Sequence, residues 1–160
     1  MENVVLKIEN LSHRYSVQWA IKDINFEIPG KGIFGLLGSN GAGKSTIMNI
    51  MCGVLRPTEG NVWIKGISMT ENAVKAKRYI GFLPQNPPVQ MELTVNEYLS
   101  YCAGLRDIPR KEVQKAVDKV MERCAISHFK KRVIRNLSGG YRQRVGIAQA
   151  LLNNPKILIL

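Results

Sequence analysis

A glycine-rich stretch with one lysine lies at Gly38–Thr46, where the sequence reads GSNGAGKST. This pattern, G-x-x-x-x-G-K-[ST], is typical of a loop whose backbone N–H groups surround phosphate oxygens, because glycine allows dihedral angles and close approaches that a Cβ would obstruct. We expect the ammonium group of Lys44 to reach the β- and γ-phosphates of a nucleotide and the hydroxyl of Ser45 to coordinate Mg²⁺. The predicted phosphate-binding residues are Ser39, Asn40, Gly41, Ala42, Gly43, Lys44, Ser45 and Thr46.

Two flanking elements are expected to position this loop. Ile33–Leu37 is a short, nearly continuous apolar run, as expected of a strand that is covered on both faces. In residues 45–54 apolar side chains recur at helical spacing, and Gly53 and Pro57 mark the end of the predicted helix. The positive end of that helix adds to the anion site. The order of strand, loop and helix therefore supports phosphate binding.

Further strands are predicted on either side of this region. Val4–Leu11 and Ile21–Ile28 alternate apolar and polar residues, which favours two antiparallel strands with one face exposed to water. Asn61–Lys65, Tyr79–Leu83 and Lys156–Leu160 also read as strands.

Three helices are predicted in the second half of the chain. Thr94 and Glu97 form a capping box ahead of a helix over about residues 95–105. Pro109 suits the first turn of the next helix, which carries one apolar stripe, and these two helices form an insertion. Ser138 is the expected N-cap of a third helix, which runs to about Leu152. The stripe consists of Val113, Ala116, Val117, Val120, Met121 and Cys124.

The composition is that of one soluble globular domain. With 160 residues, of which 45% are hydrophobic and 22% charged, the chain is far from the composition of disordered proteins. The first residues lack the pattern of a secretory signal, and no apolar stretch approaches the ~20 residues that cross a bilayer. Cys52, Cys102 and Cys124 are odd in number and widely spaced, which argues against a disulfide framework and against a zinc site.

The formal net charge of +11 can indicate nucleic acid, an acidic membrane surface or bound phosphate as a partner. The basic residues are dispersed, however, and lack interleaved aromatic residues that could stack on bases. Solvated faces are therefore favoured over a nucleic-acid groove. The residues concerned are Lys75, Lys77, Arg78, Arg110, Lys111, Lys130, Lys131, Arg132 and Arg135.

A second motif, LSGGYRQR, lies at Leu137–Arg144 and continues as VGIAQALLNNPKILIL. Together with GSNGAGKST, and with Gln85 in YIGFLPQN between them, it resembles the ATP-binding subunit of ABC transporters over essentially the whole chain. The resemblance implies an α/β fold, namely a P-loop NTPase (RecA-like) core with an N-terminal antiparallel β subdomain and a helical insertion, with the C-terminal part missing. It implies a β subdomain and phosphate-loop core at residues 1–88, a helical subdomain at 89–136, and a signature helix with the start of a further strand at 137–160.

The resemblance also implies roles for residues outside the phosphate loop. Tyr15 takes the place of the aromatic ring that stacks on adenine, with Trp19 as the competing candidate. Gln85 corresponds to the glutamine that contacts Mg²⁺ and the attacking water, so it is the expected catalytic residue beside Lys44. The signature loop, which binds the γ-phosphate held by a second subunit, corresponds to Ser138, Gly139 and Gly140.

The partners implied by the resemblance are a second ATP-binding subunit and a transmembrane permease. The two subunits would be arranged head to tail with two ATP molecules between them, so that binding closes the pair and hydrolysis releases it. The permease would dock around Asn86–Leu105 and hold the protein at the cytoplasmic face of a membrane, with no direct span and no nucleic acid. The general likeness of residues 36–60 favours an exporter.

The resemblance is incomplete at the end of the sequence. In the family, the strand that corresponds to Lys156–Leu160 leads into an aspartate for Mg²⁺ and then a glutamate that polarises the attacking water, and neither is present. Phosphoryl transfer depends on such positioning and charge stabilisation. We therefore expect a fragment of a longer ATPase that binds nucleotide weakly and hydrolyses it poorly.

Two other functions stay open at the level of the sequence. A soluble ATPase of the same type that acts on nucleic acid or on the ribosome would fit the positive charge. Its chromosome-associated relatives carry a long coiled coil, however, and residues 86–137 are too few and show no sustained heptads. A non-catalytic nucleotide-binding module would fit the absence of the two carboxylates.

Overall fold

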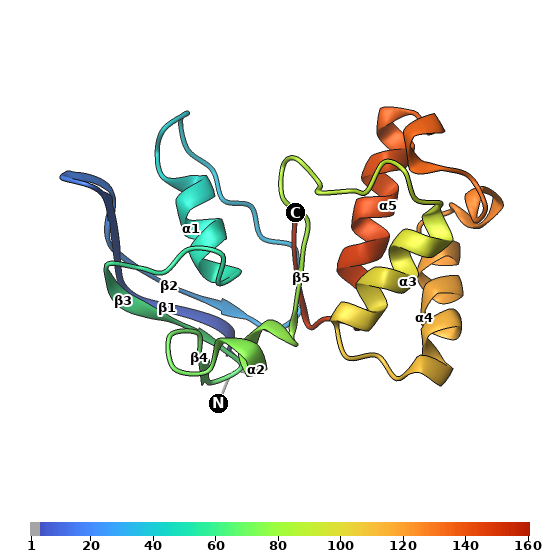
Figure 1. Ribbon diagram of the computed structural model, residues 1–160. Helices are drawn as coiled ribbons and strands as arrows, with labels where there is room; N and C mark the ends of the chain where they lie inside the picture. Colours follow the sequence, from blue (N-terminus) through green and yellow to red (C-terminus); the bar gives the residue numbers. More distant parts are fainter. Residues whose placement is uncertain (1–3) are drawn as a thin grey trace. The chain divides into compact units, whose positions relative to one another are not determined.

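The chain forms two compact units, residues 1–79 and residues 80–160 (Figure 1). The computed structural model describes residues 4–160. The first unit is built on an antiparallel sheet, and the second on packed helices with a parallel pair of strands. The predicted subdivision at residues 88 and 136 stays a prediction.

An antiparallel sheet in the order β2-β1-β3-β4 forms the first unit within its described residues. The predicted strands at residues 4–11, 21–28 and 61–65 are confirmed, and the first two join in a long hairpin. The strands are β1 (Val4–Tyr15), β2 (Gln18–Pro29), β3 (Glu59–Ile64) and β4 (Ile67–Ser68).

Alternation along these strands places one set of apolar side chains in the core. Leu6 and Ile8 are two residues apart and lie on the same face, whereas Leu11 follows at a spacing of three. Asn10, with φ of 49°, lies where the β1–β2 register shifts, and this bulge returns Leu11 to the buried face. The sheet core consists of Leu6, Ile8, Leu11, Val62 and Ile64, each at most 1% exposed.

Helix α1 (Lys44–Met51) ends earlier than the predicted residue 54. The N–H of Cys52 still donates to the carbonyl of Met48 at 3.0 Å, but Gly53 then adopts φ of 64°, a left-handed value that ends a helix. A shorter helix, α2 (Ala73–Lys77), begins at Asn72, whose side chain accepts a hydrogen bond from the N–H of Lys75.

The predicted strand at Ile33–Leu37 is wrong. The segment has no regular secondary structure, and its side chains at Ile33 and Leu37 are almost fully exposed. A strand covered on both faces needs parallel neighbours. The strands in the described part of the first unit are all antiparallel, so the apolar run has no ladder to join within its own unit.

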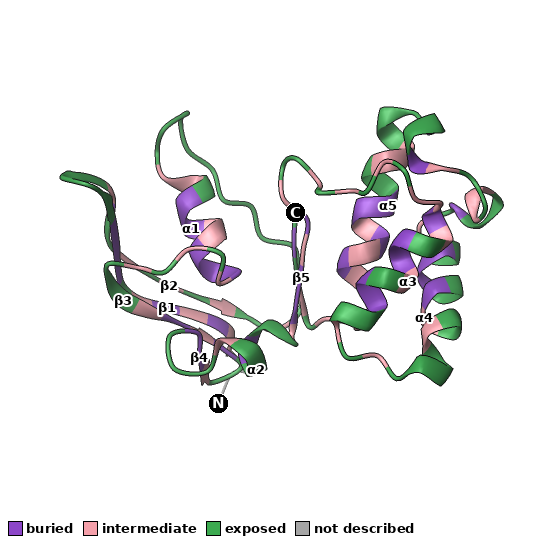
Figure 2. Ribbon diagram, in the orientation of Figure 1, coloured by how far each residue is buried: buried purple, intermediate pink, exposed green. Residues whose placement is uncertain are grey.

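In the second unit three helices pack together, and Figure 2 shows buried residues on the faces that they turn toward one another. They are α3 (Val95–Leu105), α4 (Arg110–Arg123) and α5 (Gly139–Leu151), with 3₁₀ turns η1 (Ser127–Phe129) and η2 (Ile134–Asn136) before α5. The predicted strands at residues 79–83 and 156–160 form a parallel pair, β5 (Ile80–Phe82) and β6 (Ile157–Ile159). The helical core includes Val95, Leu99, Ala103, Val117, Met121, Ile126, Ile134, Val145 and Ala148.

Local signals explain how the helices of this unit begin. The N–H of Glu97 donates to the hydroxyl of Thr94 at 3.2 Å, and the N–H of Thr94 donates to the carboxylate of Glu97 at 2.8 Å, so the predicted capping box is confirmed. Pro109 is the N-cap of α4 rather than part of its first turn, because its ψ of 136° is extended. Ser138 is the N-cap of α5, but its side chain accepts no capping hydrogen bond.

Candidate functional site

Gly38–Thr46 folds as a loop that runs into the first turn of α1. Gly41 and Gly43 have φ of 83° and 85°, values that glycine adopts without strain. The N–H of Ala42 donates to the carbonyl of Ser39 at 3.2 Å, and Gly43 is the N-cap of α1. The first N–H groups of a helix have no intrahelical partner, and the first turn of α1 carries no acidic side chain. The loop therefore suits an anion.

Gly43 also packs directly against β2. A Cβ at this position would lie 2.3 Å from Cγ2 of Ile21 and 2.8 Å from the carbonyl oxygen of Ala20. Both the dihedral angle and the close approach therefore require glycine. The contact joins the loop to the β1–β2 hairpin, the element that carries Tyr15.

The side chain of Lys44 folds back over its own loop. Its ammonium group donates to the carbonyl oxygen of Gly38 at 2.8 Å and to that of Ser39 at 2.7 Å. An ammonium group has three donors, so a third is left for an anion. Ser45 is exposed, whereas Thr46 is buried, so the hydroxyl of Ser45 is the more accessible oxygen for a metal ion.

Tyr15 lies beside the turn of the β1–β2 hairpin, opposite Gln18. Its side chain is 54% exposed, and its ring meets that of His13 edge-on, with 4.8 Å between the centroids. The ring of Trp19 is less exposed, and the guanidinium of Arg14 lies 5.7 Å from its centroid, in cation–π geometry. Tyr15 therefore offers the freer ring for stacking.

Gln85 lies in the second unit, in the loop that follows β5. Its exposed side chain lines a pocket of about 690 Å³. Gly139, at the start of α5, lines the same pocket with Arg142 and Gln143. The structure therefore brings Gln85 and the signature segment together, while Lys44 and Tyr15 belong to the first unit.

The segment Ser138–Gly140 forms the exposed start of α5. A Cβ on Gly139 or on Gly140 would meet no atom within 4 Å. The fold of this chain therefore leaves room for side chains at both positions. The hydroxyl of Ser138 and the N–H groups of the first turn of α5 are donors of the kind that bind anions.

Contacts between α5 and the chain at the end of β5 were missed by sequence reasoning. A Cβ on Gly146 would lie 2.6 Å from Cδ1 of Leu83, and Nε2 of Gln149 donates to the carbonyl oxygen of Phe82 at 3.2 Å. A glycine inside a helical pattern is a sequence signal of close packing. Gln149 has no such signal.

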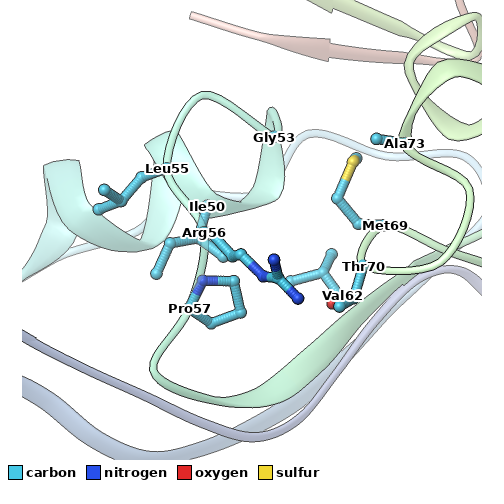
Figure 3. A pocket seen from close by; sticks show the side chains of 9 residues that line it. All are labelled: Ile50, Gly53, Leu55, Arg56, Pro57, Val62, Met69, Thr70 and Ala73. Carbon is cyan, nitrogen blue, oxygen red and sulfur yellow. The ribbon is translucent and has the colours of Figure 1, made fainter.

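A second pocket, of about 190 Å³, lies in the first unit beside the end of α1. Figure 3 shows the side chain of Arg56 extending across it toward Thr70. No predicted site residue lines it, so it is separate from the phosphate loop. Its lining is mostly apolar and consists of Ile50, Gly53, Leu55, Arg56, Pro57, Val62, Met69, Thr70 and Ala73.

Residues 4–160 hold no cluster of three or more His, Cys, Asp or Glu side chains that could bind a metal ion. Mg²⁺ prefers oxygen ligands and keeps several waters, so the Ser45 hydroxyl and the Gln85 amide oxygen are donors of a suitable kind. In the same range of residues, no helix has the length and apolar character needed to cross a membrane.

The prediction that the basic residues lack interleaved aromatic residues that could stack on bases stays a prediction, and the structure adds one cluster of basic and aromatic side chains. The guanidinium of Arg132 lies 5.5 Å from the ring centroid of Phe129, and that of Arg144 lies 5.5 Å from the ring centroid of Tyr141. The two rings also meet, with 4.6 Å between their centroids. Because one ring comes from η1 and the other from α5, residue spacing did not reveal the cluster. One face of each ring therefore has a guanidinium group over it.

Comparisons with known proteins agree with this geometry. A family model described as "ABC transporter" matches residues 21–160. The chain is 35% identical over 156 residues to the uncharacterized ABC transporter ATP-binding protein YxlF of Bacillus subtilis (strain 168), covering 98% of this chain and 51% of that protein. It is 35% identical over 153 residues to the sulfate/thiosulfate import ATP-binding protein CysA of Mesostigma viride. This match covers 96% of this chain and 44% of that protein. The chain thus spans about half the length of these curated relatives.

Solved structures share the fold. The structure of cbiO1 from Clostridium perfringens, described as part of the ABC transporter complex cbiONQ, matches with a TM-score of 0.85 and 32% identity over 99% of this chain and 65% of that chain. The dimeric structure of a bacterial ABC transporter cassette matches with a TM-score of 0.84 and 30% identity over 96% of this chain and 72% of that chain. The predicted fold class, an α/β P-loop NTPase cassette with an N-terminal antiparallel sheet, is confirmed.

Proposed function

The chain belongs to the ABC transporter family, and from this we propose that its residues 39–46 bind the phosphates of ATP in a subunit that powers transport across a membrane. The geometry of the phosphate loop carries the proposal. Gly41 and Gly43 have left-handed backbones, and the ammonium of Lys44 lies over the loop beside the first turn of α1. The names of the related proteins, which describe them as ATP-binding, give independent support.

Lys44 and Tyr15 are the proposed side-chain contacts to the nucleotide in the first unit. The ammonium of Lys44 donates to the β- and γ-phosphates, and each charge-assisted hydrogen bond of this kind is worth roughly 1.5 to 3 kcal/mol. Backbone N–H groups of the loop add further donors. The ring of Tyr15 stacks on adenine, by analogy with base stacking worth ~1 to 3 kcal/mol.

Ser45 and Gln85 are the proposed ligands for Mg²⁺. When bound together with the nucleotide, this ion neutralises charge that develops on the transferred phosphoryl group. The hydroxyl of Ser45 and the amide oxygen of Gln85 supply two oxygen donors, and phosphate oxygens and waters complete the shell. Gln85 also orients the attacking water, which makes it, with Lys44, a proposed catalytic residue.

The proposed partners are a second ATP-binding subunit and a permease. In a head-to-tail dimer, Ser138, Gly139 and Gly140 bind the γ-phosphate held by the second subunit. This is supported by the open space around both glycines, since their small size has no packing reason in their own chain. Two solved relatives, one described as dimeric and one as part of a transporter complex, also favour it. The permease docks around residues 86–105 and holds the subunit at the cytoplasmic face of the membrane.

Export is the proposed direction of transport, on the strength of residues 36–60. Two relatives are named as import proteins, for sulfate or thiosulfate and for molybdate or tungstate. A transport assay with the full-length protein and its permease, in inverted and right-side-out vesicles, distinguishes the two directions. ATP-dependent uptake only into inverted vesicles supports export.

ATP hydrolysis is the proposed activity of the full-length protein. The 160 residues alone are expected to turn over more slowly than ~1 per second, a typical enzyme rate. Full-length protein that binds ATP but does not hydrolyse it, even with its permease, would favour the non-catalytic module instead.

Amide hydrogen exchange during a titration with ATP and Mg²⁺ tests the phosphate site. We expect residues 38–46 to gain protection with ATP and to gain much less with AMP, which lacks the β- and γ-phosphates. Protection that appears only outside the first unit, or none at millimolar ATP, would overturn the proposal.

Nucleic acid is not among the proposed partners, because the basic residues are dispersed along the chain. A titration with a labelled single-stranded oligonucleotide at low salt should show no binding. Tight binding that weakens steeply as salt is added would favour the nucleic-acid alternative.

A further inference from the structure

The loop that carries Gln85 is attached at its start to α5. At the end of β5, the carbonyl oxygen of Phe82 accepts a hydrogen bond from Nε2 of Gln149 at 3.2 Å. One turn earlier on the same helix, Gly146 lies so close to Leu83 that a Cβ would come within 2.6 Å of its Cδ1. Gly146 and Gln149 are three residues apart, so both lie on one face of the helix.

The far end of the same loop is attached just before α5. The N–H of Arg135 donates to the carbonyl of Met91 at 3.0 Å, and the N–H of Ile134 donates to the carbonyl of Leu93 at 2.9 Å. Residues 84–90 therefore span two anchors, and both anchors belong to the stretch that contains the signature segment. Gln85 lies close behind the first anchor.

Gln149 is held in one orientation by bonds on both sides of its amide. Its Oε1 accepts from Nη2 of Arg106 at 2.7 Å, while its Nε2 faces Phe82. Arg106 also donates through Nη1 to Oδ1 of Asn153 at 3.0 Å. Both acceptors are neutral, and burial lowers the pKa of Arg106. If the amide were reversed, its NH₂ group would face the guanidinium and its oxygen would face a carbonyl, so only the observed orientation satisfies both neighbours.

We propose that Gln149 is a positioning residue, which fixes the start of the Gln85 loop to the helix that begins at Ser138. A displacement of the signature segment is then transmitted to Gln85 through α5. This role deepens the proposed function and rests on it, since it matters only if both segments act on nucleotide. It requires the amide of Gln149 in particular, because a carboxylate would keep the bond to Arg106 but could not donate to Phe82.

The test compares Gln149→Glu with Gln114→Glu in the 160-residue chain. Gln114 is a matched control, because it lies in the same unit and its Nε2 is also a hydrogen-bond donor, to Asn96 and Asp118. Amide exchange is measured without nucleotide over residues 80–93 and, for comparison, over α4. In Gln149→Glu we expect exchange over residues 80–93 to be faster by roughly five- to tenfold and exchange over α4 to be unchanged. Gln114→Glu should leave residues 80–93 unchanged.

Two outcomes would overturn the proposal. One is unchanged exchange over residues 80–93 in Gln149→Glu. The other is a uniform increase over the whole second unit, which would mean that Gln149 serves only general stability. If Gln149→Glu does not fold, Gln149→Met takes its place, since methionine is of similar length but cannot donate a hydrogen bond to the carbonyl of Phe82. The same local acceleration is then expected, and its absence overturns the proposal.

Kinetics of the full-length protein separate this proposal from the proposed function. Gln149→Glu should lower kcat for ATP hydrolysis and leave KM unchanged, because the phosphate loop is intact. An unchanged kcat in Gln149→Glu counts against the positioning role. If the unmodified protein neither binds nor hydrolyses ATP, the proposed function fails, while the exchange result still decides whether Gln149 anchors the loop.

Discussion

The ammonium nitrogen of Lys44 lies 2.7 Å from the carbonyl oxygen of Ser39, five residues earlier in the same loop. This hydrogen bond folds the positive charge back over the loop that leads into α1. Charge and backbone donors therefore share one small region, and the lysine side chain loses little further freedom when it binds a phosphate.

Lys44→Ala should weaken ATP binding by roughly 10- to 100-fold, since it removes a charge-assisted hydrogen bond worth about 1.5 to 3 kcal/mol. Isothermal titration with ATP and Mg²⁺ measures the change. Lys22→Ala is the matched control, because Lys22 is an exposed lysine on β2 of the same unit. The Lys22→Ala variant should bind ATP with the same affinity as the unmodified chain. Equal affinities for Lys44→Ala and the unmodified chain would remove the phosphate loop from the proposal.

Gly43→Ala should destabilise the fold more than Gly41→Ala. Both residues have positive φ, which costs an alanine about 1 kcal/mol, but only at Gly43 would the methyl group overlap Ile21 and Ala20. We expect the Gly43 variant to lose roughly 1 to 3 kcal/mol more. Urea unfolding of the two variants measures the difference. Equal unfolding midpoints for Gly43→Ala and Gly41→Ala would show that β2 moves away from the added methyl group without loss of stability.

Tyr15→Ala should weaken ATP binding by roughly 5- to 100-fold through the loss of stacking, whereas Tyr15→Phe should bind almost normally. Binding of inorganic triphosphate provides the control, because it has no base and should be insensitive to both variants. A similar loss for triphosphate would mean that Tyr15 acts on the phosphate loop and not on adenine.

Thr94→Ala should destabilise the second unit by about 1 kcal/mol, the usual effect of losing an N-cap side chain. Ser100→Ala, inside the same helix, should have a much smaller effect. Thermal unfolding followed by circular dichroism measures both. A Thr94→Ala variant as stable as the Ser100 control would mean that water replaces the capping hydroxyl.

The capping box also predicts a dependence of stability on pH. Hydrogen bonds from the backbone and side chain of Thr94 hold the pKa of Glu97 below its ordinary value of 4.5. Because the folded-state pKa is the lower one, the contribution is present above pH 4.5 and is lost as the pH falls through the folded-state value. The stability difference between Thr94→Ala and the unmodified chain should therefore shrink in acid. A difference that stays constant down to pH 2 would exclude this linkage.

Burial should make the thiol of Cys52 unreactive in the folded chain. Burial raises its pKa to about 12, so almost no thiolate is present at neutral pH. Cys124 is only half-buried and should react with a thiol reagent before Cys52 does. In denaturant all three cysteines should react quickly. Fast modification of Cys52 at pH 7.5 in the folded protein would show that this part of the core opens readily.

Elements whose signals are local could be predicted from the sequence. The helix predicted over about residues 95–105 is observed at Val95–Leu105, and its start could be predicted because Thr94 and Glu97 form a capping box within four positions. Ile33–Leu37 shows the limit of such reasoning. An apolar run predicts that a segment is buried, but whether the segment forms a strand depends on neighbouring strands from elsewhere in the chain.

The candidate site divides in the same way. The phosphate loop could be predicted because its glycines, Lys44 and Ser45 all lie within the short segment Gly38–Thr46. The attachment of Gln85 could not, because it depends on the packing of α5 against β5, which brings Gln149 to a carbonyl 67 positions earlier in the sequence. The contact of Arg132 with Phe129, only three positions apart, was missed because it depends on the turn that η1 makes.

The open surroundings of Gly139 and Gly140 determine which assays can detect a substitution at these positions. Replacement by alanine there would improve helix propensity and disturb no packing, so the altered chain should be as abundant and as heat-resistant as the original. If two ATP-binding subunits work together as proposed, an altered chain would still pair with an intact partner subunit and inactivate the pair. Screens that rank variants by expression or melting temperature would not distinguish such a chain from the original. Only a measurement of activity on the assembled pair of subunits would reveal the defect.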